Sequence, residues 1–120
     1  MPAVGPLQKA DHMLTPPVID AHHNFWDPAA RDYPWLVDGF APLRRRYGPA
    51  DLEPELATEQ MTGSVLVQTL PSAEETAELL ATAAGVSFVR GVVGWVDLTA
   101  PDVAERIERL RAGPGGQLLV

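Results

Sequence analysis

The sequence predicts an α/β fold made of parallel strands connected by helices. Short apolar segments rich in β-branched residues occur at 18–23, 64–69 and 90–96, and another occupies 117–120. Segments with helical periodicity or capping residues alternate with them, and such alternation predicts parallel strands joined by right-handed crossovers. Three β/α units and a strand fit an open doubly wound sheet or the first part of a TIM (β/α)8 barrel, which needs about 250 residues. The apolar end at 117–120 favours the incomplete barrel, because a self-contained domain rarely ends within a buried strand.

The first strand is followed by a long aromatic segment and a short helix. Pro16 and Pro17 disfavour a helix and favour extended backbone before the strand. The segment 22–49 is irregular and rich in aromatic side chains, and an ordered loop of this length is often functional. A helix then follows from Asp51, which can cap it, to about Met61.

The second strand and its helix carry the clearest local signals. The strand 64–69 is nearly all apolar, which suits a sheet covered on both faces. Ser72, with Glu75 three residues later, forms a capping box. A helix is therefore predicted over 73–84, ending before Gly85.

The third strand, 90–96, precedes a helix with an apolar stripe. Thr99 is predicted to cap this helix, and Gly113 and the glycines after it end it. The stripe has helical spacing and consists of Val103, Ile107 and Leu110. These elements assign residues 18–120 to the N-terminal part of a barrel domain and residues 1–17 to a disordered lead-in.

The composition limits the partners and the compartment. The chain has 120 residues, a net charge of −7 and no long basic run, which argues against a nucleic-acid partner. It has no cysteine, so disulfides and thiolate zinc sites are excluded, and a cytoplasmic location is expected. No apolar run approaches the roughly 20 residues that span a bilayer, so no membrane partner is expected.

The strongest candidate for chemistry is a histidine doublet at the end of the first strand. Side chains alternate along a strand, so Asp20, His22 and Asn24 are predicted to point one way and His23 the other. Reactive groups of parallel sheets lie at the carboxyl ends of strands, where His22 and Asn24 lie. Imidazole suits zinc, whereas a neutral amide oxygen is a poorer ligand. The alternative is a packed, hydrogen-bonded histidine with no ligand.

Other candidates have weaker signals. Gln68 ends the second strand and Asp97 follows the third, where site residues are expected, although Gln68 could simply satisfy backbone groups. Arg45, in the middle of an arginine triplet, could bind a substrate carboxylate, with a solvated loop charge as the alternative. Trp26 could wall a pocket or belong to the core.

The motif "IDAHHNFWDP" resembles the amidohydrolase-related TIM-barrel hydrolases, in the branch of sugar lactonases and muconolactone-type hydrolases. The resemblance continues through "LRRRYGPADLEPEL", "VLVQTLPSAEETAELL" and "GVVGWVDLTAPDVAERIERL" and covers about residues 18–120. The family pattern is aspartate–x–histidine–x–histidine. His22 takes the first histidine position, and Asn24 stands at the second.

The resemblance implies a hydrolase of small carboxylated lactones, with His22 and Asn24 as catalytic residues. Trp26, Arg45, Gln68 and Asp97 would contact the substrate. It implies one divalent metal, zinc, in full-length members, with His22 as a ligand and Asn24 as a weak one. Some members work without metal. The chain would be an N-terminal fragment, inactive alone and able to self-associate through exposed barrel edges. The alternative is a self-contained, non-catalytic α/β binding module.

Overall fold

The computed structural model describes residues 16–120 and contains a parallel three-stranded sheet. The strands β1 (Ile19–His23), β2 (Gly63–Val67) and β3 (Val89–Val93) lie side by side in the order β1-β2-β3. Both neighbouring pairs are parallel, which confirms the predicted α/β class. The lead-in expected at 1–17 lies almost wholly outside the described residues.

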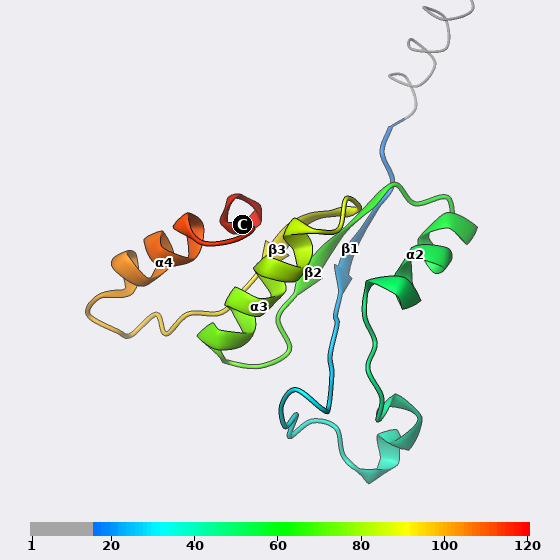
Figure 1. Cartoon of the computed structure of the whole chain (residues 1–120), viewed down its shortest axis with the longest axis horizontal. Coiled ribbons are helices and arrows are strands. Elements are labelled where there is room, and N and C mark those ends of the chain that lie inside the picture. The colour runs from blue at the N-terminus through cyan, green and yellow to red at the C-terminus, as the bar shows by residue number, and fades with distance from the viewer. Residues whose placement is uncertain (1–15) are drawn as a thin grey trace, which may run out of the picture.

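The helices within residues 16–120 are the 3-10 helix η1 (Asp38–Leu43), α2 (Pro49–Thr58), α3 (Ala73–Ala84), α4 (Val103–Ala112) and a second 3-10 helix, η2 (Gly116–Leu118). Of these, η1 and α2 connect β1 to β2, α3 connects β2 to β3, and α4 and η2 follow β3 (Figure 1). Figure 1 shows α2 beside β1, α3 packed along β2 and β3, and the segment between β1 and α2 extending beyond the carboxyl ends of the strands. Within residues 16–120, no helix has the length and apolar character needed to cross a bilayer.

The core lies between the sheet and α3. Its buried members come from both layers and from the segment after β1: Phe25, Leu66, Leu79, Leu80, Ala83, Val89 and Val92. The opposite face of the sheet is less covered, since Val65 and Val67 are half-buried and Val93 is 37% exposed. The sheet is therefore covered well on one face only, contrary to the two-sided cover that its apolar sequence predicts.

Both β2 and β3 end earlier than predicted, at Val67 and Val93 instead of residues 69 and 96. The amides of Thr69 and Leu70 donate to the carboxylate of Glu75 in α3, so they leave the strand ladder. Trp95 likewise uses its backbone N–H to bind a side chain of α3. The strand ends are thus set by contacts with the helix.

The helix α2 begins two residues before the predicted start and ends before Met61. Pro49 occupies its first turn, where a missing N–H costs nothing. Asp51 is the third residue of the helix, and its Oδ2 accepts from the Gly48 N–H at 2.8 Å. The predicted cap therefore lies inside the first turn.

The predicted bounds of α3 are confirmed, but its capping box is only half formed. Ser72 Oγ accepts from the Glu75 N–H at 3.1 Å, as expected. The carboxylate of Glu75 does not return to the N–H of Ser72, which donates to the carbonyl of Leu70. It binds the end of β2 instead.

Thr99 does not cap α4, which starts at Val103. The Thr99 N–H and hydroxyl both donate to Asp97 Oδ1, at 2.9 Å and 2.6 Å, and this turn delays the helix. Asp102 stands at the cap position, although its side chain makes no capping hydrogen bond.

The prediction of a fourth strand at 117–120 is wrong for most of these residues. Residues 116–118 form η2, which follows a left-handed turn at Gly115. Leu119 alone forms a parallel bridge, with Val92 of β3, and the Val120 N–H donates to the Val92 carbonyl at 3.1 Å. The pairing has the predicted direction, but the glycine turn leaves room for only one bridge.

Candidate active site at the end of β1

A β-bulge shapes the end of β1. Asp20 lies opposite Ser64, and His23 lies opposite Leu66, so three steps along β1 match two along β2. The extra residue resets the alternation of side chains. Asp20 therefore shares a face with His23, contrary to the prediction that it shares a face with His22 and Asn24.

His23 is a packed residue on the face covered by α3. Its Nε2 lies 2.8 Å from Ser64 Oγ, and its ring meets Phe25 edge-on at 4.8 Å. Burial lowers the pKa of His23 below its ordinary value of 6.5, opposed by the charge of Asp20. Ser64 has 0% exposure, so its hydroxyl cannot reach a substrate, and its contact with His23 serves packing.

His22 and Asn24 lie on either side of His23, towards the face that α3 leaves uncovered. The side chain of His22 is exposed, and its backbone N–H donates to Asp20 Oδ1 at 3.2 Å. Asn24 is half-buried, and its Nδ2 donates to the carbonyl of Val67 at 2.8 Å. This bond anchors Asn24 to the carboxyl end of β2 and fixes the direction of its amide.

Three of the predicted site residues line one pocket of about 390 Å³: Asn24, Trp26 and Arg45. The remaining walls come from the end of β1, the approach to α2 and α2 itself: His23, Phe25, Tyr47, Gly48, Asp51, Leu52 and Glu55. All four consecutive residues 23–26 line the pocket. Because neighbouring strand residues point to opposite faces, the pocket lies at the end of the strand and not over one face of the sheet. Its volume suits a small ligand.

Trp26 forms an aromatic wall of this pocket. Its backbone pairs with that of Tyr47 in an antiparallel bridge, and its Nε1 donates to the Leu43 carbonyl at 2.9 Å. Its ring lies 4.7 Å from the Tyr47 ring and 5.5 Å from the Trp35 ring, between centroids. These contacts hold the long aromatic segment against the strand end.

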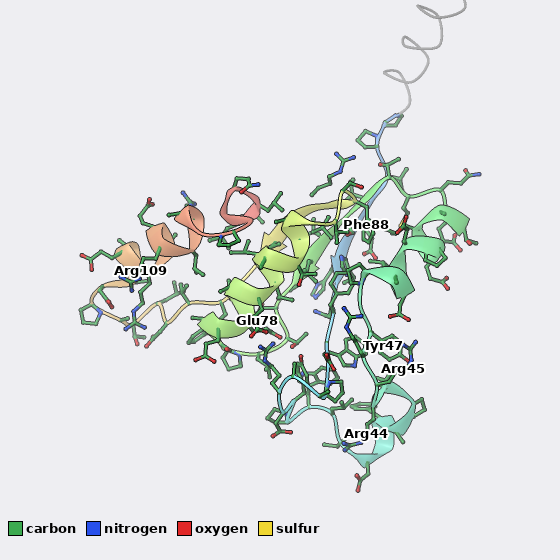
Figure 2. All side chains as sticks on the ribbon, viewed as in Figure 1. Arg44, Arg45, Tyr47, Glu78, Phe88 and Arg109 are labelled. Atoms are coloured by element: carbon green, nitrogen blue, oxygen red, sulfur yellow. The ribbon has the colours of Figure 1, made fainter. Side chains whose placement is uncertain are left out.

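Arg45 is held by three contacts, and Figure 2 shows it beside Tyr47 between α2 and the aromatic segment. Its guanidinium carbon lies 3.6 Å from the centroid of the Tyr47 ring. Nη1 donates to Asp51 Oδ1 at 3.0 Å and to the Arg46 carbonyl at 2.7 Å. The hydrogen bond with Asp51 raises the pKa of Arg45.

His22, Gln68 and Asp97 do not line this pocket. The Gln68 N–H donates to the Val93 carbonyl at 2.8 Å, so its backbone continues the sheet. Asp97 accepts both Thr99 hydrogen bonds, and the hydroxyl bond is the main cause that lowers the pKa of Asp97. Asp97 therefore stabilises a turn in this structure.

Tyr47 and Asp51, the two side chains that hold Arg45 at this pocket, were not among the site residues predicted from the sequence. Asp51 was predicted only as a helix cap. Arg45 lies at a bend, so the sequence pattern did not indicate its contact with Tyr47 two residues later.

The described residues do not form a zinc site. They contain no group of three or more histidine, aspartate or glutamate side chains placed to hold an ion. His22 and Asn24 alone offer one imidazole and one amide oxygen, fewer than the three or four ligands that zinc uses.

Asp51→Asn is expected to reduce the loss of stability on acidification. The Gly48 N–H, and then Arg45, lower the pKa of Asp51 below its ordinary value of 3.8. The stabilisation is thus present above pH 3.8 and is lost as the pH falls through the lower, folded-state pKa. Urea unfolding between pH 2 and 6 would show a shallower decline for the variant.

Glu53→Gln is the matched control, since it removes the same charge from an exposed position of α2. A decline as steep in Asp51→Asn as in the parent would contradict the assigned contact.

The amidohydrolase family profile matches residues 19–116. The L-fucono-1,5-lactonase of Burkholderia ambifaria is 45% identical over 96 residues, which are 80% of this chain and 33% of that protein. The L-fucono-1,5-lactonase of Burkholderia multivorans is 41% identical over 93 residues, 78% of this chain and 31% of that protein. The chain thus spans about a third of the length of these curated relatives.

Solved structures agree with these matches. An amidohydrolase of Burkholderia multivorans with bound zinc superposes with a TM-score of 0.73 and 40% identity, covering 78% of this chain and 33% of that one. A second crystal form, with bound HEPES, superposes with a TM-score of 0.77 and 38% identity. This match covers 82% of this chain and 34% of that one. The three parallel β/α units are consistent with part of a TIM barrel of this kind. With the profile match over most of its length, the chain belongs to the amidohydrolase family.

Proposed function

We propose that this chain forms part of a lactone hydrolase whose substrate is an uncharged lactone of a sugar acid. The observation that carries the proposal is the convergence of Asn24, Trp26 and Arg45 on one pocket at the carboxyl end of β1. Parallel β/α folds place their sites at this edge. The curated relatives named as L-fucono-1,5-lactonases support the same reaction class.

The charge of the pocket favours an uncharged ring over a carboxylated one. Arg45 is the cation of the lining and is already paired with Asp51, while Glu55 adds a second carboxylate. A substrate carboxylate would have to displace Asp51 and approach Glu55, and like charges at close range are unfavourable. Hydroxyl groups of a sugar lactone can instead bond to both carboxylates and stack on the aromatic wall. A carboxylated, muconolactone-type substrate is the second candidate, because Arg45 could pair with it.

In the proposed reaction, water adds to the lactone carbonyl carbon and the bond from that carbon to the ring oxygen breaks. The ring oxygen takes up a proton, and the product is an open hydroxy acid. His22 lies outside the lining of this pocket, and its exposed imidazole would approach the substrate from outside it. There it would polarise the carbonyl oxygen, where negative charge develops, while Asn24 would donate a hydrogen bond to the same oxygen from the pocket wall. Trp26 would exclude bulk water from the pocket. Gln68, which also lies outside the lining, would contact a part of the substrate that extends towards the neighbouring strand end.

The chain is further proposed to need additional β/α units for activity. It spans about a third of its lactonase relatives, and one face of its sheet is poorly covered. Exposed strand edges and apolar faces promote association. Alone, the chain is therefore expected to be inactive and to self-associate.

A reconstitution experiment tests this function. The chain would be coexpressed with the part of the Burkholderia ambifaria lactonase that it does not match. The purified assembly is expected to hydrolyse L-fucono-1,5-lactone, measured by acid release, and to prefer it to a carboxylated muconolactone. Assays with a chelator, and with zinc restored, would show whether the assembly needs a metal.

The chain alone and the relative's part alone serve as controls. A chain that stays monomeric in light scattering, melts sharply and yields no lactonase on coexpression would refute the proposal. That result would favour the non-catalytic binding module.

A further inference from the structure

The first turn of α3 contains two buried polar side chains that the proposed site does not use. Glu75 and Thr76 each have 0% exposure. Carboxylates are almost never fully buried unless they are paired or hydrogen-bonded, because removing a charge from water is costly. Their hydrogen bonds lead to the carboxyl ends of two neighbouring strands.

Glu75 holds the segment that follows β2. Its Oε1 accepts from the Thr69 N–H at 2.9 Å and from the Leu70 N–H at 3.1 Å. Its Oε2 accepts from the Thr69 hydroxyl. The position in the first turn of α3 also stabilises a negative charge. The carboxylate therefore fixes the backbone directly after Gln68.

Thr76 holds the segment that follows β3. Its Oγ1 accepts from the Trp95 N–H at 2.7 Å and lies 3.0 Å from the Trp95 carbonyl oxygen, to which it can donate. A Cβ on Gly94 would lie 2.3 Å from the Thr76 methyl carbon, so only glycine permits this approach. The end of β3 is thus fitted to one side chain of α3.

We propose that Glu75 and Thr76 are positioning residues that form one clamp, holding the ends of β2 and β3 in a fixed relative arrangement. They are consecutive in one helical turn, so movement of either segment must move the same turn. The clamp would hold Gln68 and Trp95 together at the carboxyl edge of the sheet, the edge on which the proposed pocket lies, although neither residue lines that pocket. Its catalytic consequence rests on the proposed lactonase function, whereas its structural consequence does not. Such support limits the freedom of site residues.

Hydrogen exchange of the 120-residue chain tests the clamp directly. Thr76→Val, which keeps the shape but removes the hydroxyl, is expected to speed exchange of the Trp95 amide about tenfold. Thr76→Ser keeps the hydroxyl and should restore slow exchange. Glu75→Gln is expected to speed exchange at Thr69 and Leu70 and also to shift the Trp95 indole NMR signal. Glu74→Gln, which removes an exposed charge from the same turn, should do neither.

Any of three outcomes would overturn the proposal. Unchanged Trp95 exchange in Thr76→Val, or an equal disturbance in Thr76→Ser, would show that the hydroxyl does not hold this segment. A Glu75→Gln effect confined to residues 69–70 would show two independent contacts and no clamp. The amides of α2 serve as an internal reference for global unfolding.

The catalytic consequence is measured in the reconstituted assembly. Thr76→Val should lower kcat while KM stays within about twofold, and Thr76→Ser should restore kcat. An assembly without lactonase activity would refute the proposed function, and the exchange experiment would still decide the clamp. A normal kcat in Thr76→Val would overturn its catalytic part.

Discussion

Replacing Gly115 with alanine is expected to lower the free energy of unfolding by about 2–5 kcal/mol. Gly115 has a φ of +68°, a left-handed conformation that favours glycine. A Cβ at this position would lie 2.0 Å from the carbonyl oxygen of Leu80, which is 1% exposed in the core. That contact is with backbone, so no side-chain rotation relieves it, and α3 and η2 must separate.

Gly113→Ala is the matched control two residues earlier. Gly113 has a φ of −85°, and its added Cβ would meet backbone no closer than 3.5 Å. Urea unfolding at one fixed protein concentration should show a much larger loss of stability for Gly115→Ala than for Gly113→Ala. Equal values for the two variants would contradict the close approach of η2 to α3.

The three strands and α3 were predictable because their signals are local. The β-branched runs, Ser72 and the glycine after α3 act within a few residues, and all appear in the structure. The ends of β2 and β3 were not predictable, because they depend on Glu75 and Thr76 meeting residues up to 19 positions away. A capping box predicts where a helix starts. It does not indicate that the carboxylate of Glu75 binds the segment after β2 in place of the N-cap N–H.

The candidate site was predictable in its residue types but not in its geometry. Asn24, Trp26 and Arg45 were separate candidates in the sequence, and the structure places them around one pocket. Asp97 was placed correctly after β3, yet its carboxylate accepts hydrogen bonds from Thr99. The bulge in β1 was also hidden, because it arises from the register with β2 and not from the sequence of β1 alone.

Replacing His22 with alanine is expected to lower lactone turnover by the reconstituted assembly about 100- to 1,000-fold. This corresponds to about 2.7–4 kcal/mol of barrier, the usual cost of losing one contact to a developing oxyanion. His22 is exposed and its side chain makes no hydrogen bond within residues 16–120, so its removal should change the free energy of unfolding by less than about 0.5 kcal/mol. The loss would therefore come from the reaction and not from folding.

The turnover of His22→Ala, together with the effect of a chelator on the parent assembly, also separates metal-dependent from metal-independent hydrolysis. Unchanged turnover in His22→Ala would remove His22 from the reaction and leave it as an exposed strand residue. Turnover lost by the parent assembly with a chelator and restored by zinc would show that Asn24, which stands where the family has a second histidine, does not prevent metal binding. If the parent instead keeps its activity in chelator while His22→Ala is inactive, then the imidazole acts without a metal. In that case the Asn24 amide, anchored to the Val67 carbonyl, becomes the next side chain to substitute.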